Sequence, residues 1–98
     1  MAKVTFTTAG DTLIAYLSGE IDHHTAQLLR RQIDGQIAGC MPAALVMDFG
    51  GVGFMDSSGV GLILGRARQM QAFEGRLMVQ KAPPAIQKML DLARIEYI

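Results

Sequence analysis

The spacing of hydrophobic residues changes several times along the chain, and each change predicts a new element of secondary structure. Residues 4–8 and 12–18 are rich in β-branched and apolar side chains, and an Ala-Gly-Asp stretch at positions 9–11 separates them. Extended segments of this composition around a glycine turn are typical of a β-hairpin. The N-terminal part of the chain is therefore predicted to form two antiparallel strands.

Apolar residues recur every three or four positions after Gly19, which predicts an amphipathic helix of about four turns. Asp22 stands just before this pattern, where its carboxylate can cap the free N–H groups of the first turn. Gly39 and Pro42 are expected to end the helix. Its apolar stripe consists of Ala26, Leu29, Ile33 and Ile37.

The middle of the chain combines an apolar run with a second helical pattern. Residues 43–49 are apolar except for Asp48, which predicts a strand buried on both faces. A polar turn over residues 54–61 follows, and the helix after it ends at Glu74 and Gly75. The apolar stripe of this second helix consists of Val60, Ile63, Leu64, Ala67 and Met70.

The C-terminal part continues the alternation of strands and helices. Residues 76–80 and 95–98 predict strands, and Pro83-Pro84 opens a short helix between them, since proline is tolerated in a first helical turn. The order β-β-α-β-α-β-α-β predicts parallel neighbours joined by helical crossovers. We therefore expect an α/β fold, with a single domain over residues 1–98 and helices packed on a mixed sheet.

Composition narrows the possible functions. Half of the 98 residues are hydrophobic, and nine Lys and Arg balance nine Asp and Glu. This neutral chain gives no electrostatic reason to expect nucleic acid or an anionic membrane as a partner. No apolar stretch approaches the roughly 18 residues that span a bilayer, and no signal-like segment follows Lys3. We expect a cytoplasmic protein that is monomeric when free.

Metal and thiol chemistry have little support. Cys40 is the only cysteine, which excludes an internal disulfide and a cysteine metal cluster. His23 and His24 are adjacent, and adjacent residues on a helix project about 100° apart, so they cannot converge on one ion. We expect an exposed histidine pair, and neither a metal nor a cofactor.

The turn before the second helix is the main candidate for a functional site. Asp56, Ser57 and Ser58 fall where an N-cap is expected, so the first free N–H groups of the helix point at them. Gly59 and Gly61 weaken helix propensity by about 1 kcal/mol each, and their bare backbone lets another surface approach. The flanking apolar residues Phe54, Met55 and Val60 are expected to hold this turn rigidly.

A phosphoryl group on Ser57 would be stable at this place. It would add roughly −1.5 to −2 charges at a helix start, where free N–H groups and the helix dipole favour an anion. Since the strands before the two helices are predicted to be parallel neighbours, Asp22 and Asp56 should share the same sheet edge. Their carboxylates and the phosphoryl group would together repel a docking partner.

Two stretches also resemble the signature motifs of a known family. Residues 19–26 read Gly-Glu-Ile-Asp-His-His-Thr-Ala, and residues 54–66 read Phe-Met-Asp-Ser-Ser-Gly-Val-Gly-Leu-Ile-Leu-Gly-Arg. Both are similar to the motifs of the bacterial anti-sigma factor antagonists, which are single-domain STAS proteins, and most of all to their sporulation branch, which acts on the sigma-F system. Longer members continue past the last strand into a further helix, whereas this sequence ends at Ile98.

This resemblance implies a regulatory cycle. In the family, the unmodified antagonist binds an anti-sigma factor that is also a serine kinase, which frees the sigma factor. The kinase uses its bound ATP to phosphorylate the serine after the motif aspartate, here Ser57, and a serine phosphatase reverses the reaction. The positions that match the partner-binding face are Asp22, Asp56, Ser57, Ser58, Gly59 and Gly61.

The remaining charged and nucleophilic residues allow alternative functions to be considered. Arg66, like the arginines at positions 30, 31 and 68, is predicted to be solvated, and it is the arginine best placed to contact a partner. A serine hydrolase is not expected, because Met55 stands where a Gly-x-Ser-x-Gly elbow has its first glycine. A STAS module that binds a nucleotide or small ligand, or a stress-signalling scaffold, stays open as the alternative, although no Walker loop is present.

Overall fold

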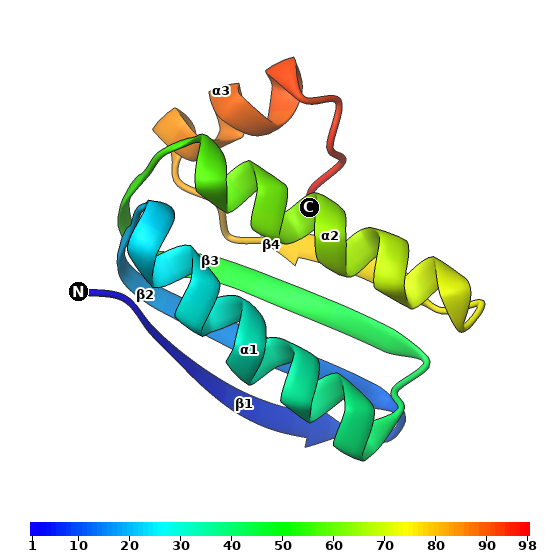
Figure 1. Cartoon of the computed structure of the whole chain (residues 1–98). Coiled ribbons are helices and arrows are strands. Elements are labelled where there is room, and N and C mark those ends of the chain that lie inside the picture. The colour runs from blue at the N-terminus through cyan, green and yellow to red at the C-terminus, as the bar shows by residue number, and fades with distance from the viewer.

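Four strands form one sheet in the order β1-β2-β3-β4 in the computed structural model, which describes all residues Met1–Ile98. β1 pairs with β2 in antiparallel orientation, while β2 with β3 and β3 with β4 are parallel. The predicted hairpin and mixed sheet are therefore confirmed (Figure 1). The elements are β1 (Lys3–Ala9), β2 (Thr12–Ile21), α1 (His23–Cys40), β3 (Ala44–Met55), α2 (Ser57–Ala72), β4 (Arg76–Gln80) and α3 (Pro84–Leu92).

The long helices α1 and α2 lie side by side across one face of the sheet (Figure 1). Side chains alternate along a strand, so each strand turns every second residue toward these helices. The residues of β2 and β3 on this face are fully buried, whereas Tyr16 and Met78 on the other face are exposed. The buried residues are Leu13, Ala15 and Leu17 of β2 and Leu45, Met47 and Phe49 of β3.

The two central strands are longer than predicted. β3 continues past Phe49 to Met55, and β2 continues past Ser18 to Ile21. The segment after Phe49 stays in the sheet because it pairs with β2, where Gly51 lies opposite Ser18. Glycine is needed at this position, since a Cβ at Gly51 would lie 2.9 Å from the Cβ of Ser18. The polar turn is therefore shorter than expected and consists of Asp56 alone.

α1 ends between Gly39 and Pro42, as predicted, although it is longer than the expected four turns. It has 18 residues, includes Gly39 and is closed by Met41, which adopts the left-handed conformation with φ 46°. The buried residues Leu29, Ile33 and Ile37 confirm the predicted apolar stripe. None of the helices is long and apolar enough to cross a lipid bilayer.

The predicted last strand is absent. Residues 95–98 form no strand, and only one backbone hydrogen bond, from the N–H of Ile98 to the carbonyl of Val79 at 2.9 Å, connects them to β4. The chain leaves α3 through Arg94 in the left-handed conformation, and the Ile95 N–H bonds back to the Leu90 carbonyl at 2.9 Å. After this helix ending, the last three residues lie next to β4, but only Ile98 forms a backbone hydrogen bond with it.

Candidate functional site

The carboxyl ends of β2 and β3 meet at one edge of the sheet. Ile21 and Met55 are partners in the parallel pairing, and each is followed directly by an aspartate that begins a helix. The N–H of Asp56 also donates a hydrogen bond to the carbonyl of Ile21 at 3.1 Å. The structure thus confirms the prediction that Asp22 and Asp56 share one edge, and we call these residues and Ser57 the acidic edge.

Asp22 caps α1 as predicted. Its Oδ1 accepts hydrogen bonds from the N–H groups of His24 at 3.0 Å and Thr25 at 2.9 Å, and the Thr25 hydroxyl accepts the Asp22 N–H at 2.9 Å in return. The Thr25 N–H is the main cause that lowers the pKa of the Asp22 carboxyl, because it stabilises the ionised form. Asp22 is exposed, so its charge faces the surroundings of the protein.

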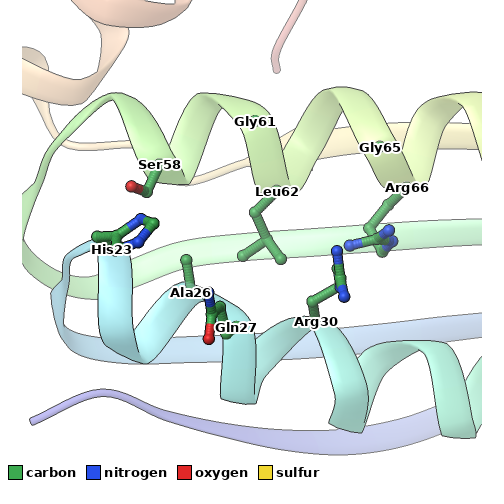
Figure 2. Close-up of a pocket in the computed structure, with 9 residues that line it drawn as sticks. All are labelled: His23, Ala26, Gln27, Arg30, Ser58, Gly61, Leu62, Gly65 and Arg66. Atoms are coloured by element: carbon green, nitrogen blue, oxygen red, sulfur yellow. The ribbon is translucent and has the colours of Figure 1, made fainter.

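Asp56 caps α2 in the same way. Its Oδ1 accepts the Ser58 N–H at 2.8 Å, and its backbone carbonyl accepts the Gly59 N–H at 3.0 Å. Ser57 is the first residue of α2 and is exposed, whereas Ser58 is partly buried and lies on the side of α1 (Figure 2). The structure therefore presents the Ser57 side chain on the surface at the positive end of a helix.

Of the three apolar residues expected to hold this turn, Met55 and Val60 pack against the core as predicted, and Phe54 does not. Phe54 is 54% exposed and does not anchor the turn, whereas Met55 is buried as expected. Gly59 is also buried, and a Cβ there would lie 2.2 Å from Met55, so the missing side chain serves internal packing. Only Gly61, where a Cβ would meet no atom within 4 Å, offers bare backbone to another molecule.

Arg66 is not solvated, contrary to the prediction. It is only 8% exposed, and its Nε lies 2.9 Å from Oδ1 of Asp34 on α1. The Nε hydrogen itself is directed to Oε1 of Gln69 at 3.3 Å, so the contact with Asp34 is an ion pair and not a directional hydrogen bond. The spacing could have revealed this burial, because Arg66 follows the buried Leu62 by one helical turn. The arginines at positions 30, 31 and 68 are exposed as predicted.

A groove runs between α1 and α2 from Ser58 to Arg66 (Figure 2). It has a volume of about 350 Å³, and we call it the α1–α2 groove. Its lining is mostly polar or small, with Leu62 buried between the helices. The lining residues are His23, Ala26, Gln27, Arg30, Ser58, Gly61, Leu62, Gly65 and Arg66.

The histidine pair and the cysteine are exposed. The rings of His23 and His24 meet edge to face with centroids 5.7 Å apart, and Cys40 ends α1 at the far end from the acidic edge. No three His, Cys, Asp or Glu side chains lie close enough together to hold a metal ion. The exposure of both histidines agrees with the prediction.

Comparison with known proteins places this arrangement in a family. The chain matches the STAS domain over residues 3–98. An anti-sigma F factor antagonist from Lysinibacillus sphaericus is 35% identical over 83 residues, which cover 85% of this chain and 71% of that protein.

Two solved structures of SpoIIAA, a Bacillus cell fate determinant, are also similar, each with 29% identity over 98% of this chain. The unphosphorylated form has a TM-score of 0.84 and is covered to 88%, and the phosphorylated form has a TM-score of 0.78 and is covered to 91%. The match over almost the full length, together with this identity to an anti-sigma F factor antagonist, means that the chain belongs to the STAS domain family.

Proposed function

We propose that this protein is an anti-sigma factor antagonist whose unphosphorylated form binds an anti-sigma factor that is also a serine kinase, and so releases the sigma factor. The observation that carries the proposal is the exposed Ser57 at the first position of α2, on the same edge as Asp22. The relative from Lysinibacillus is named an anti-sigma F factor antagonist, and SpoIIAA is described in a phosphorylated and an unphosphorylated form.

The surroundings of Ser57 suit a switch that acts on binding and leaves the fold intact. The side chain is exposed, so a phosphoryl group needs no repacking, and the helix dipole of α2 favours its negative charge. Asp56 already accepts the Ser58 N–H, so the added charge stands beside an ionised carboxylate at the surface. A partner that docks here would meet a much more negative surface after phosphorylation.

The proposed partner-binding face is the acidic edge together with the first turns of α2. Asp22, Asp56 and Ser57 contribute charge and hydrogen bonding, and Ser58 and Gly61 extend the face toward the α1–α2 groove. Gly59 is not part of the exposed face, and its lack of a side chain lets the helix pack closely on Met55. Arg66 is buried, so its part in the proposal is to hold α1 against α2 through Asp34.

A kinase assay tests the proposal directly. The protein is incubated with the cognate anti-sigma kinase, with and without Mg-ATP, and analysed by intact mass and peptide mapping. We expect one phosphoryl group on Ser57. Ser57→Ala should bind the kinase and stay unmodified, whereas the matched control Ser58→Ala should still be phosphorylated. Modification of Ser58, or of neither serine, would contradict the proposal.

A charge mimic tests the effect on binding. Ser57→Asp should weaken binding to the kinase by at least about tenfold, because a docked partner would cover a third carboxylate next to Asp22 and Asp56, and like charges that are placed together at an interface are strongly unfavourable. The measurement is isothermal titration calorimetry, with Ser57→Asn as the neutral control of similar size. Equal affinity of the two variants would mean that charge at this position is not the switch. A serine phosphatase should restore the affinity of the phosphorylated protein.

A thermal-shift screen with nucleotides alone separates the alternative of a nucleotide-binding module. A ligand that binds only the folded state raises the unfolding temperature with concentration. The proposed antagonist uses the ATP of its kinase partner, so we expect no such rise for the isolated protein.

A further inference from the structure

Two guanidinium groups converge between α1 and α2, and a single carboxylate faces them. Arg66 points from α2 toward α1, and Arg30 points from α1 toward α2, so the charged ends of both side chains lie in the α1–α2 groove (Figure 2). Asp34 is the ion-pair partner of Arg66. The count of charges is two positive and one negative, which leaves this part of the groove with an excess positive charge.

Arg66 has a donor without a partner. Its Nη1 is buried and makes no hydrogen bond, while its Nε serves Gln69 and faces Asp34. A buried donor that loses water without gaining an acceptor is unfavourable, and native structures contain few of them. Burial lowers the pKa of the Arg66 guanidinium, the charge of Asp34 opposes this, and the nearby Arg30 adds to it. The group remains protonated, because arginine is not deprotonated in proteins.

The groove has open space next to these charges. Gly61 and Gly65 lie one turn apart on the wall that α2 forms, and a Cβ at either position would meet no atom within 4 Å. Ser58 stands at the end nearest the positive end of α2. The volume of about 350 Å³ lies near the lower limit of about 300 Å³ for pockets that hold small molecules.

We propose that the α1–α2 groove binds a small oxyanion of the phosphate class, either free phosphate or a phosphomonoester, through Arg66 and Arg30. Phosphate oxygens can accept hydrogen bonds from Arg30, which is exposed and free to turn, and from the part of the Arg66 guanidinium that lines the groove, while the enclosed Nη1 stays out of reach. The oxyanion neutralises the excess charge, and the two glycines leave room for the organic part of an ester. This site is separate from Ser57, and its occupancy requires neither a protein partner nor phosphorylation.

Amide NMR titration of the isolated protein with sodium phosphate tests the site, with sodium chloride at equal ionic strength as the reference. We expect a saturable shift of the amides of Ser58, Gly61 and Gly65 with phosphate alone. A second titration with glycerol 3-phosphate distinguishes the two sources. Tighter binding than phosphate assigns the site to an ester, and equal or weaker binding assigns it to the free ion.

Three variants locate the bound anion. Arg30→Gln should weaken binding about tenfold, since it removes one charge-assisted contact, and it should keep the fold because Arg30 is exposed. Arg68→Gln is the matched control on the outer face of α2 and should bind as the parent does. Gly65→Leu fills the groove without removing charge and should abolish binding, while the rest of its spectrum reports an intact fold.

Three results would contradict the proposed oxyanion site. Chloride shifts equal to those of phosphate, equal weakening by Arg30→Gln and Arg68→Gln, or undiminished binding to Gly65→Leu would each do so. Because the titrations contain no kinase, these failures leave the switch at Ser57 untouched, and a failed kinase assay leaves the groove untouched.

Discussion

The acidic edge and the α1–α2 groove lie beside each other but satisfy their polar groups in different ways. Asp22 and Asp56 each accept backbone N–H groups from residues two or three positions further along the chain. Asp34 and Arg66, by contrast, come from different helices, and Oδ1 of the first and Nη1 of the second have no hydrogen-bond partner. At the acidic edge the capping hydrogen bonds form within a few residues of each aspartate, whereas the contact between Asp34 and Arg66 depends on the packing of two helices and leaves two buried polar atoms without a hydrogen bond.

The largest expected effect on stability comes from breaking the ion pair of the groove. Asp34→Ala leaves the charge of Arg66 buried without a counter-charge, so the free energy of unfolding should fall by about 2 kcal/mol. This is less than the usual ~3–5 kcal/mol for a buried pair, because the Asp34 side chain is 37% exposed. Urea denaturation measures the change.

The double variant is the control for this ion pair. Asp34→Ala with Arg66→Met removes both charges and should recover most of the lost stability, since an apolar replacement of a buried pair is often neutral. If Asp34→Ala has the same free energy of unfolding as the parent protein, the ion pair does not stabilise the packing of the two helices, and the contrast with the acidic edge disappears.

Two glycines of α2 sharpen the comparison, because their replacement by alanine should change the stability of the protein in opposite directions. Gly59→Ala places a Cβ 2.2 Å from the buried Met55 and should destabilise the protein by about 1–2 kcal/mol through overpacking. Gly61→Ala faces the open groove and should stabilise it by up to about 1 kcal/mol through helix propensity. Thermal unfolding of both variants measures this, and changes of equal sign would contradict the difference in packing.

Removal of a cap tests the acidic edge by itself. Asp56→Ala deprives the Ser58 N–H of its acceptor, so the free energy of unfolding should fall by about 1 kcal/mol. Asp56→Asn keeps an acceptor without the charge and should retain stability, while any change in kinase binding then reports the charge. The denaturant midpoints of Asp56→Ala and Asp56→Asn measure the change. An equal loss of stability in both variants would mean that Asp56 does not stabilise the helix through its hydrogen bond.

The smallest expected effect is that of Asp22 on the pH dependence of stability. Its pKa is lower in the folded protein than the ordinary 3.8, chiefly because of the Thr25 N–H. Because the carboxyl pKa is lower in the folded state, the unfolded state binds more protons at acid pH. The contribution of Asp22 to the free energy of unfolding is therefore complete above pH 3.8 and is lost as the pH falls through the lower pKa of the folded state. Asp22→Asn should flatten this acid limb of the urea midpoint slightly. An identical pH profile for both proteins would show that the capping hydrogen bonds do not depend on the charge.

The sequence was sufficient to predict the features that depend on near neighbours and on alternation. Both caps were predicted because the groups they serve are two or three residues away. The shared edge followed from the parallel pairing of β2 and β3, which the order of strands and helices implied. These features need no knowledge of which side chains meet across the fold.

The errors arose where distant segments decide the outcome. Arg66 was expected in solvent because arginine usually is, but its position on the inner face of α2 places it against Asp34 of α1. The apolar run predicted a strand that ends at Phe49, whereas pairing with β2 continues β3 through the following glycines to Met55. Residues 95–98 have a composition suited to a strand, but after the end of α3 only Ile98 forms a backbone hydrogen bond with β4, so no strand pairing develops.

The hydrogen bond from the Asp56 N–H to the Ile21 carbonyl, at 3.1 Å, connects the end of β2 to the start of α2. Both loops that a partner would touch are therefore preorganised before any encounter. Docking onto such a surface sacrifices little conformational entropy, which favours affinity from a small contact area. Under the proposed switch, the same stiffness would keep the loops from yielding to an extra dianion, so even one modified oxygen would change how the whole face is recognised.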